Sequence, residues 1–220
     1  MLKIPFGKDK LTSAIYDAGM VSNGNKCNCI CLECGKDLQA VHPQVLNRQK
    51  FFRHKPGTDC QGTLESIFHF AAKEIIKKST SLKISEDESF SYSSCDIEMT
   101  KYSKRPDAYI TNQSTSLIVE ILFSHQIESS TLDVYLNNNE RVLEINISAE
   151  KNKLFNYEYF KDWVLSHAPR ELYVQPQKLE ADTSGKHNAA GDKSESDIGV
   201  YIVLGLIGAW LYRRFFKGRG

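Results

Sequence analysis

The chain has 220 residues, of which 41% are hydrophobic and 25% charged, a composition typical of a globular domain, and its length leaves room for an appendage. Its formal net charge of +1 excludes binding to nucleic acid through overall charge alone. Residues 1–55, however, carry nine Lys or Arg against four Asp or Glu. This local excess of positive charge favours an N-terminal module that faces phosphate groups.

The cysteines indicate a reducing compartment or a metal site. The segment Met1–Gly7 is followed by charged residues instead of an apolar core region, and we therefore expect no secretory signal here. The six cysteines are then expected to be thiols or metal ligands and not disulfides.

The spacing of four residues predicts a zinc site. Cys31-x2-Cys34-Gly35 has the spacing of a zinc knuckle, in which glycine permits the positive φ that directs backbone amides at the thiolates. His54 ends a predicted strand, and Cys60 follows it. These two residues would complete a tetrahedral set of three cysteines and one histidine.

Two further cysteines, Cys27 and Cys29, leave the ligand set open. Four thiols within eight residues can also form an all-thiolate site, and either cysteine can compete for one position. Under both alternatives we expect residues 1–62 to form a zinc-ribbon-like module.

A helix is predicted from Thr63 to Ser79. Its apolar stripe recurs at helical spacing and consists of Leu64, Ile67, Phe68, Ala71, Ala72, Ile75 and Ile76. Glu65, His69 and Lys73 fall at i, i+4 and i+8 on another face, where an acid, an imidazole and an ammonium group form a line. Such a line is either a solvated helix face with ion pairs or part of a functional site.

Two strands are predicted at 106–111 and 117–122 from their β-prone residues. Each carries one carboxylate in an apolar run, Asp107 in the first and Glu120 in the second. Glu120 shares a strand face with Leu122, so its carboxylate projects from a hydrophobic wall. Carboxylates at adjacent strand ends can hold Mg²⁺ or Mn²⁺. The alternative is an ordinary edge-strand glutamate and a turn aspartate.

The remaining pattern predicts an α/β fold with a mixed sheet flanked by helices, in a core domain of residues 63–175. Alternation indicates an antiparallel meander of 81–84, 89–99, 106–111 and 117–122, then a helix near 128–138, a strand at 142–147, a helix at 155–166 and a strand at 171–175. A crossover helix between 117–122 and 142–147 implies that these two strands pair in parallel.

The C-terminal part changes in character. Residues 176–197 are polar, small and charged, which is typical of a flexible linker. Ile198–Tyr212 then holds fifteen residues without a charge. As a helix this run spans about 22 Å, short of the roughly 30 Å hydrocarbon core. Extension to residue 216, with two arginines reaching the interface, makes 198–216 a predicted transmembrane helix, against the alternative of an interfacial or buried helix.

Two arguments conflict on the orientation of this anchor. The basic residues after Tyr212 favour a cytoplasmic C-terminus, which would export the body of the protein. The thiolate zinc site and the absence of a predicted export signal favour a body that stays in the cytoplasm. Because so short a tail is easily translocated, we expect a single-pass C-terminal anchor with the body in the cytoplasm.

Several motifs occur together in an order that resembles the competence protein CoiA-like nuclease family, a branch of the PD-(D/E)xK superfamily. The matching residues are Cys31-x2-Cys34-Gly35, Phe52-Arg53-His54, Cys60, Glu65-Ser66-x2-His69-x3-Lys73, Arg105-Pro106-Asp107 and Val119-Glu120-Ile121. The resemblance covers roughly residues 27–147 and implies a restriction-endonuclease-like core that acts on DNA.

The resemblance also implies roles for individual residues. Asp107 and Glu120 would bind the catalytic metal, Glu65 would assist from the helix, and either His69 or His125 would transfer the proton. The sequence departs from the superfamily at Leu122, because a lysine or glutamine is usual two residues after the glutamate.

Two hypotheses follow from that departure. In the first, Lys73 reaches the site from the helix and the protein is a membrane-tethered, metal-dependent DNA endonuclease or DNA-processing factor. In the second, the protein is a catalytically degenerate zinc-binding adaptor or nucleic-acid-binding protein at the membrane.

Overall fold

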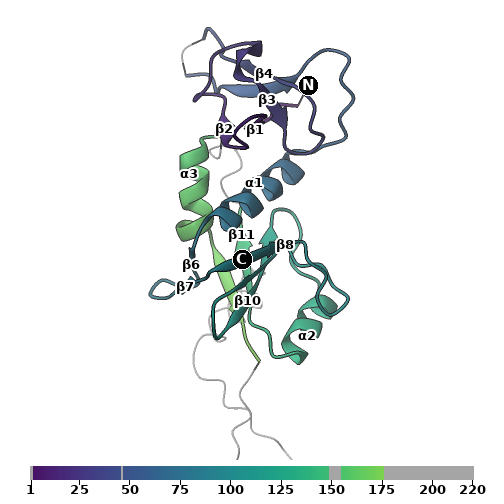
Figure 1. Ribbon diagram of the computed structural model, residues 1–220, viewed down its shortest axis with the longest axis vertical. Helices are drawn as coiled ribbons and strands as arrows, with labels where there is room; N and C mark the ends of the chain where they lie inside the picture. The colour runs from purple at the N-terminus through teal and green to yellow at the C-terminus, as the bar shows by residue number, and fades with distance from the viewer. Residues whose placement is uncertain (1, 46, 149–154, 176–220) are drawn as a thin grey trace, which may run out of the picture. The chain divides into compact units, whose positions relative to one another are not determined.

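The computed structural model describes residues 2–45, 47–148 and 155–175, all of which belong to one compact unit, Met1–Gln177 (Figure 1). The N-terminal elements are β1 (Phe6–Asp9), β2 (Ile15–Asp17), the 3₁₀ helix η1 (Asn25–Cys27), β3 (Cys29–Cys31), β4 (Leu38–Val41) and β5 (Phe51–His54). The later elements are α1 (Leu64–Lys78), β6 (Ser81–Lys83), β7 (Ser89–Ser91), β8 (Ser94–Ile97), β9 (Ala108–Thr111), β10 (Ser116–Leu122), α2 (Ser129–Asn137), β11 (Val142–Asn146), α3 (Tyr157–Asp162), the π-helical turn η3 (Trp163–His167) and β12 (Arg170–Tyr173). The predicted mixed α/β fold is confirmed.

A five-stranded sheet with the order β12-β11-β10-β9-β8 forms the centre of the fold. Strands β10 and β11 pair in parallel and the other neighbours are antiparallel, as the crossover helix predicted. The register places Val119 opposite Ala108 on β9, and Glu120 opposite Glu144 on β11.

The prediction of one continuous meander is wrong for its first part. Strands β6 and β7 form a separate two-stranded sheet, and the strand predicted at 89–99 is split into β7 and β8. The split occurs because the backbone changes its hydrogen-bond partner between two consecutive residues. Tyr92 N donates to Thr80 O at 2.9 Å, next to the small sheet, whereas Ser93 N donates to Thr111 O of the large sheet. The Tyr92 hydroxyl donates to Ile76 O at 2.6 Å and fixes this crossing to α1.

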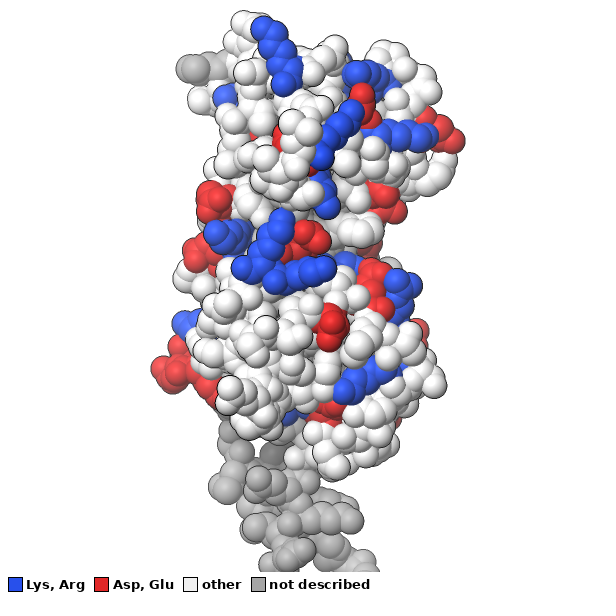
Figure 2. Space-filling view, in the orientation of Figure 1, with Lys and Arg blue, Asp and Glu red and all other residues white. Residues whose placement is uncertain are grey.

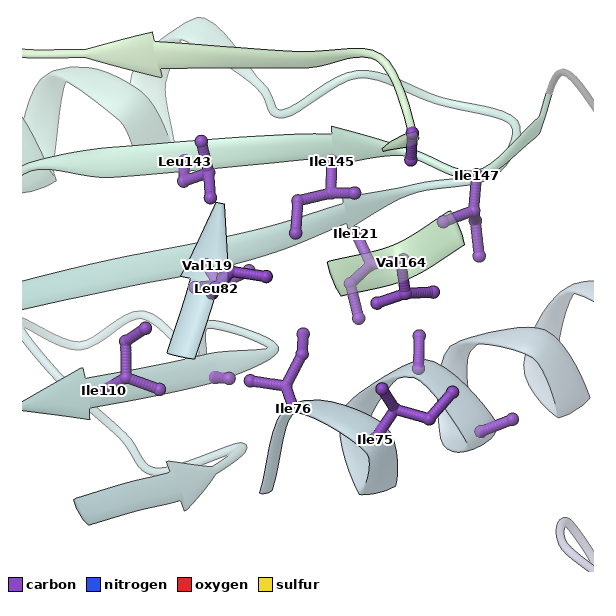
Figure 3. Packing of buried hydrophobic residues seen from close by; sticks show 14 of the residues in the cluster. Ile75, Ile76, Leu82, Ile110, Val119, Ile121, Leu143, Ile145, Ile147 and Val164 are labelled. Atoms are coloured by element: carbon purple, nitrogen blue, oxygen red, sulfur yellow. The ribbon is translucent and has the colours of Figure 1, made fainter. Parts of the chain in front are cut away.

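Helix α1 covers one face of the five-stranded sheet. Thr63 caps it, since its hydroxyl accepts from Ser66 N at 3.1 Å while Ser66 Oγ accepts from Thr63 N at 3.0 Å. The predicted apolar stripe is buried except for Leu64, which is partly buried, and Figure 3 shows Ile75 and Ile76 on the side of α1 that faces the strands. They pack with residues of β9, β10 and β11 in the largest hydrophobic cluster, which includes Ile110, Val119, Ile121, Leu143 and Ile145.

Helix α2 lies on the opposite face of the same sheet. Its Tyr135 is fully buried against Ile118 of β10 and Val142 of β11. Because side chains alternate along a strand, Glu120 shares this α2-facing side with Ile118, whereas Val119 and Ile121 face α1.

The N-terminal elements form a three-stranded sheet of order β2-β1-β3 and the hairpin β4-β5. Their hydrophobic cluster includes Ile4, Leu38 and Phe52, but also Ile67 of α1. Conversely, Phe6 of β1 packs on Phe68 of α1 with ring centroids 5.7 Å apart. The predicted module 1–62 and the predicted core 63–175 are therefore joined by shared packing.

No helix within the described ranges is long and apolar enough to cross a membrane. The predicted linker at 176–197 and the predicted transmembrane helix at 198–216 lie outside the residues that the structure describes.

Candidate functional site

The predicted zinc ligands come together from three separate segments. Cys31 ends β3, Cys34 lies in the turn after it, His54 ends β5, and Cys60 lies in the loop before α1. Their ligand atoms all lie within 4.8 Å of one another, with Cys34 Sγ 3.7 Å from His54 Nε2. Among the described residues this is the only such group of three or more His, Cys, Asp or Glu.

Backbone geometry around the sulfur atoms suits thiolates. The knuckle closes because Gly35, at φ +66°, bonds its N–H to Cys31 O at 3.0 Å, and Cys31 N bonds Lys36 O at 2.9 Å. Gly62 N donates to Cys60 Sγ at 3.4 Å. Burial raises the pKa of the Cys31 thiol to about 12, so its thiolate form depends on a nearby cation. A tetrahedral Zn²⁺ fits this donor set, and the chain can hold zinc here.

Cys27 and Cys29 do not belong to this cluster of ligand atoms, which favours the set of three cysteines and one histidine over the all-thiolate alternative. The Cys29 thiol donates to Cys27 O at 3.1 Å, and Cys29 is buried in the hydrophobic cluster of the N-terminal elements. Its role there is packing, because its exposed fraction is 1%.

Asp107, immediately before β9, lies between α1 and β10. Lys73 Nζ is 3.3 Å and His69 Nδ1 is 3.8 Å from Asp107 Oδ1, while Ile121 N donates to Oδ2 at 2.8 Å. Burial alone would raise the pKa of Asp107, but the nearby His69 ring, the hydrogen bond from Ile121 N and the charge of Lys73 hold it below its ordinary value. Asp107 is therefore an ionised carboxylate in a largely buried position.

Lys73 is buried on α1, with an exposed fraction of 7%, and is not on a solvated face. Its ammonium group lies 2.6 Å from Glu98 Oε1 as well as beside Asp107. Glu98 also accepts hydrogen bonds from the Arg105 guanidinium, through its side chain and through its backbone oxygen. The hydrogen bond from Lys73 contributes most to lowering the pKa of Glu98. Lys73 is thus held between two carboxylates.

Glu98 and Arg105 were not singled out from the sequence as site residues. Glu98 follows β8 with φ +53°, and its N–H donates to Asp107 O at 3.3 Å. The pairing of Ile97 with Ala108 continues by one position and sets Glu98 beside Asp107. The sequence does show a glutamate near the end of a predicted strand. It does not show how that strand aligns with 106–111, and so it does not predict that Glu98 lies beside Asp107.

Glu120 faces α2 and lies in an acidic part of the sheet. The Tyr135 hydroxyl donates to Glu120 Oε1 at 3.3 Å, and Glu144 is its direct partner on β11. Burial first, and then the charge of Asp107, raises the pKa of Glu120 to about 8. The charge of Glu144 acts in the same direction. Glu120 is a carboxyl group that would gain from a nearby cation.

Glu65 occupies a different position from Asp107 and Glu120. Its Oε1 accepts from Ser124 Oγ at 2.6 Å, just past the end of β10. The same hydroxyl lies 2.9 Å from His125 Nδ1, and His125 is exposed. The predicted line of Glu65, His69 and Lys73 is therefore divided: His69 and Lys73 lie beside Asp107, and Glu65 lies beside Ser124.

Leu122, where the superfamily has its lysine or glutamine, has an exposed fraction of 9%. It lies on the same strand face as Glu120. A lysine does contact Asp107, but it is Lys73 and comes from α1 instead of β10.

Comparison of the chain with protein-family models, with curated proteins and with solved structures found no match. The resemblance to CoiA-like nucleases therefore depends on the sequence motifs alone.

Proposed function

We propose that the protein is a metal-dependent nuclease that hydrolyses phosphodiester bonds in DNA, with Asp107 and Glu120 as metal ligands and Lys73 as the catalytic cation. The observation that carries this proposal is the position of Asp107. It is ionised, largely buried and in contact with a lysine, and its charge adds to the effect of burial, which is the main cause of the raised pKa of Glu120, about 8. Perturbed carboxylates of this kind concentrate at functional sites.

The two carboxylates fit a hard divalent cation. Mg²⁺ takes oxygen ligands, is commonly held by one or two carboxylates, and keeps several waters. The raised pKa of Glu120, caused first by burial and then by the charge of Asp107, supports this fit, because a bound cation would stabilise its ionised form. When bound, Mg²⁺ or Mn²⁺ would polarise the scissile phosphate and lower the pKa of a bound water.

Lys73 replaces the cation that Leu122 cannot supply. An ammonium group beside a metal-binding aspartate can orient a water and stabilise the negative charge that develops on the phosphate. Glu98 holds that ammonium in place, so Glu98 is a positioning residue in this proposal. The same pairing also favours the competing hypothesis, because a lysine engaged by two carboxylates is less available to a substrate.

Of the two histidines considered, His125 is better suited to exchange a proton with solvent. His69 Nδ1 faces Asp107, and its Nε2 is buried without a hydrogen-bond partner among the described residues. We therefore assign His69 to the orientation of Asp107. His125 is exposed and is connected to Glu65 through Ser124.

Zinc has a structural role in this proposal. A closed site of four protein ligands leaves no position for a substrate, which is typical of structural zinc. The ligands connect β3, β5 and the loop before α1, so the bound ion would fix the N-terminal elements next to the helix that carries Lys73.

We also propose that residues 198–216 anchor the protein in a membrane with the body in the cytoplasm, on the basis of their apolar sequence. Membrane fractions washed with alkaline carbonate should retain the full-length chain and release a chain that ends before residue 198. Release of both chains would contradict the anchor.

The proposed activity is tested by incubating the full-length, zinc-loaded protein with plasmid DNA and either no divalent ion, Mg²⁺ or Mn²⁺. We expect nicking or linearisation only when Mg²⁺ or Mn²⁺ is present. The runner-up function is a catalytically degenerate adaptor, favoured by Leu122 and by the engagement of Lys73 with Glu98. DNA binding without cleavage under all three conditions would support that adaptor instead.

A further inference from the structure

The hairpin β4-β5 has an outward side that no part of the candidate site uses. Its inward side is formed by Leu38, Ala40 and Phe52, which are buried in the N-terminal cluster. Side chains alternate along a strand, so the intervening residues face outward. We call this outward side the hairpin face; it consists of Gln39, Val41, Phe51 and Arg53, together with Lys3 from the segment that bridges to β5.

The aromatic residue of the hairpin face is Phe51. It is half-buried, yet it belongs to none of the three hydrophobic clusters formed by the described residues. Lys3 Nζ lies 5.4 Å from the centroid of its ring. Because Lys3 is exposed and has a flexible stem, the cation over the ring can move aside.

The charges on the hairpin face are positive. Lys3 and Arg53 are its two charged residues, and the Arg53 Nε donates to Gln39 Oε1 at 2.8 Å, which orients the guanidinium group. Asp37, the carboxylate just before β4, is already engaged by Lys10 at 2.5 Å and by Lys55 at 3.4 Å. Figure 2 shows Lys and Arg side chains, together with some Asp and Glu, among uncharged residues over the N-terminal elements.

We propose that the hairpin face binds single-stranded DNA, with one base stacked on Phe51 and the flanking phosphates held by Lys3 and Arg53. An aromatic ring flanked by cationic side chains is the arrangement that single-strand binders use, because every base has a face that can stack and every linkage carries a charge. The bases of a duplex are already stacked on each other, so the face selects unpaired strands. This inference depends on the proposed nuclease function for its biological meaning, but its binding test needs no cleavage.

The test measures fluorescence anisotropy of a labelled oligo-dT and of a duplex of equal length, with the full-length, zinc-loaded chain and without Mg²⁺. We expect the single strand to bind more tightly than the duplex. Phe51→Leu should weaken single-strand binding by at least about fivefold, the lower bound for loss of one stacked base. Phe51→Trp should keep the affinity and add tryptophan fluorescence that the oligonucleotide quenches.

Lys3→Gln and Arg53→Gln test the phosphate contacts. Each should reduce the slope of log affinity against log salt concentration by about 0.7. Tyr159→Leu and Lys161→Gln, on α3, are matched controls for an exposed aromatic residue and an exposed cation, and both should bind like wild type.

Three results would overturn the inference: equal or tighter binding of the duplex, wild-type affinity in Phe51→Leu, or no quenching in a folded Phe51→Trp protein that still binds DNA. The test of single-strand binding and the test of DNA cleavage can fail independently of each other. Loss of cleavage with intact single-strand binding rejects the nuclease, whereas cleavage with unchanged binding by the Phe51 and Arg53 variants rejects only the hairpin face.

Discussion

Lys73 Nζ lies 3.3 Å from Asp107 Oδ1, in a pair that joins α1 to the entry of β9 with 9% of the lysine side chain exposed. Glu98 Oε1 approaches the same ammonium group to 2.6 Å, so two carboxylates share one buried cation. A buried ion network of this kind is costly to disrupt, because removal of Lys73 would leave Asp107 without its nearest cation, although Glu98 would keep its pairing with Arg105. It therefore has consequences both for stability and for the proposed chemistry.

Lys73→Met should destabilise the protein by about 3 kcal/mol, since Asp107 would lose its nearest cation in a largely buried position. Urea unfolding followed by circular dichroism measures this change. Lys77→Met is the matched control, because Lys77 lies on the same helix and is exposed. A destabilisation no greater than that of the control would show that the network contributes little.

We propose that Lys73 replaces the lysine that the superfamily has at position 122. This replacement can be tested by introducing a lysine at position 122 in a variant that lacks Lys73. Leu122 shares a strand face with Glu120 and is almost buried, so Leu122→Lys would place an ammonium group at the superfamily position. We expect Lys73→Met to reduce the cleavage rate by about 100-fold or more, and Lys73→Met/Leu122→Lys to recover part of it. If Lys73→Met cleaves at the wild-type rate, Lys73 is not the catalytic cation.

Glu120 should make stability depend on pH in a specific direction. Its pKa of about 8 in the folded protein lies above the ordinary value of 4.5, mainly through burial and then through the charge of Asp107. The folded state therefore holds this proton more tightly, and the contribution of Glu120 to stability is fully present below about pH 4.5 and is lost as pH rises from about 4.5 through about 8. Glu120→Gln should remove this part of the pH dependence in thermal unfolding curves.

Mg²⁺ should counteract that loss of stability. At pH 8.5 a cation bound beside Glu120 would stabilise its ionised form, so we expect Mg²⁺ to raise the Tm of the wild type. Glu120→Gln should show little Mg²⁺-dependent change. Equal Mg²⁺-dependent shifts in the two proteins would contradict metal binding at Glu120, whatever the result of a cleavage assay.

Zinc binding should depend on Cys34 and Cys60 but not on Cys27. We expect one zinc ion per chain for the wild type and for Cys27→Ser, because Cys27 is outside the cluster. Cys34→Ser and Cys60→Ser should lose zinc and lower the Tm, since metal binding contributes directly to the folding of small zinc modules. Loss of zinc from Cys27→Ser would favour the all-thiolate arrangement.

Local patterns predicted much of this fold. The apolar stripe at 64–76 is a helical signal independent of tertiary context, and the knuckle spacing of Cys31 and Cys34 is set by one turn. Parallel pairing of β10 with β11 followed from the connecting helix. In each case the decisive contacts are close in sequence or are dictated by chain connectivity.

Long-range register was not predictable in the same way. The contact between Glu98 and Lys73 joins residues 25 apart and depends on how β8 aligns with β9. The separation of β6 and β7 from the large sheet likewise depends on Tyr92 and its hydrogen bonds to Thr80 and Ile76. Neither relationship leaves a periodic signal in the sequence, because each is set by tertiary packing.

The central claim is that Asp107 and Glu120 form a divalent-metal site for DNA cleavage. Its most direct test is the initial rate of plasmid cleavage in Mg²⁺ by zinc-loaded wild type, Asp107→Ala and Glu120→Ala, with folding of each variant verified by circular dichroism. We expect cleavage by the wild type and a loss of about 100-fold or more in each folded variant. Cleavage that persists in both variants would contradict the assignment of the site.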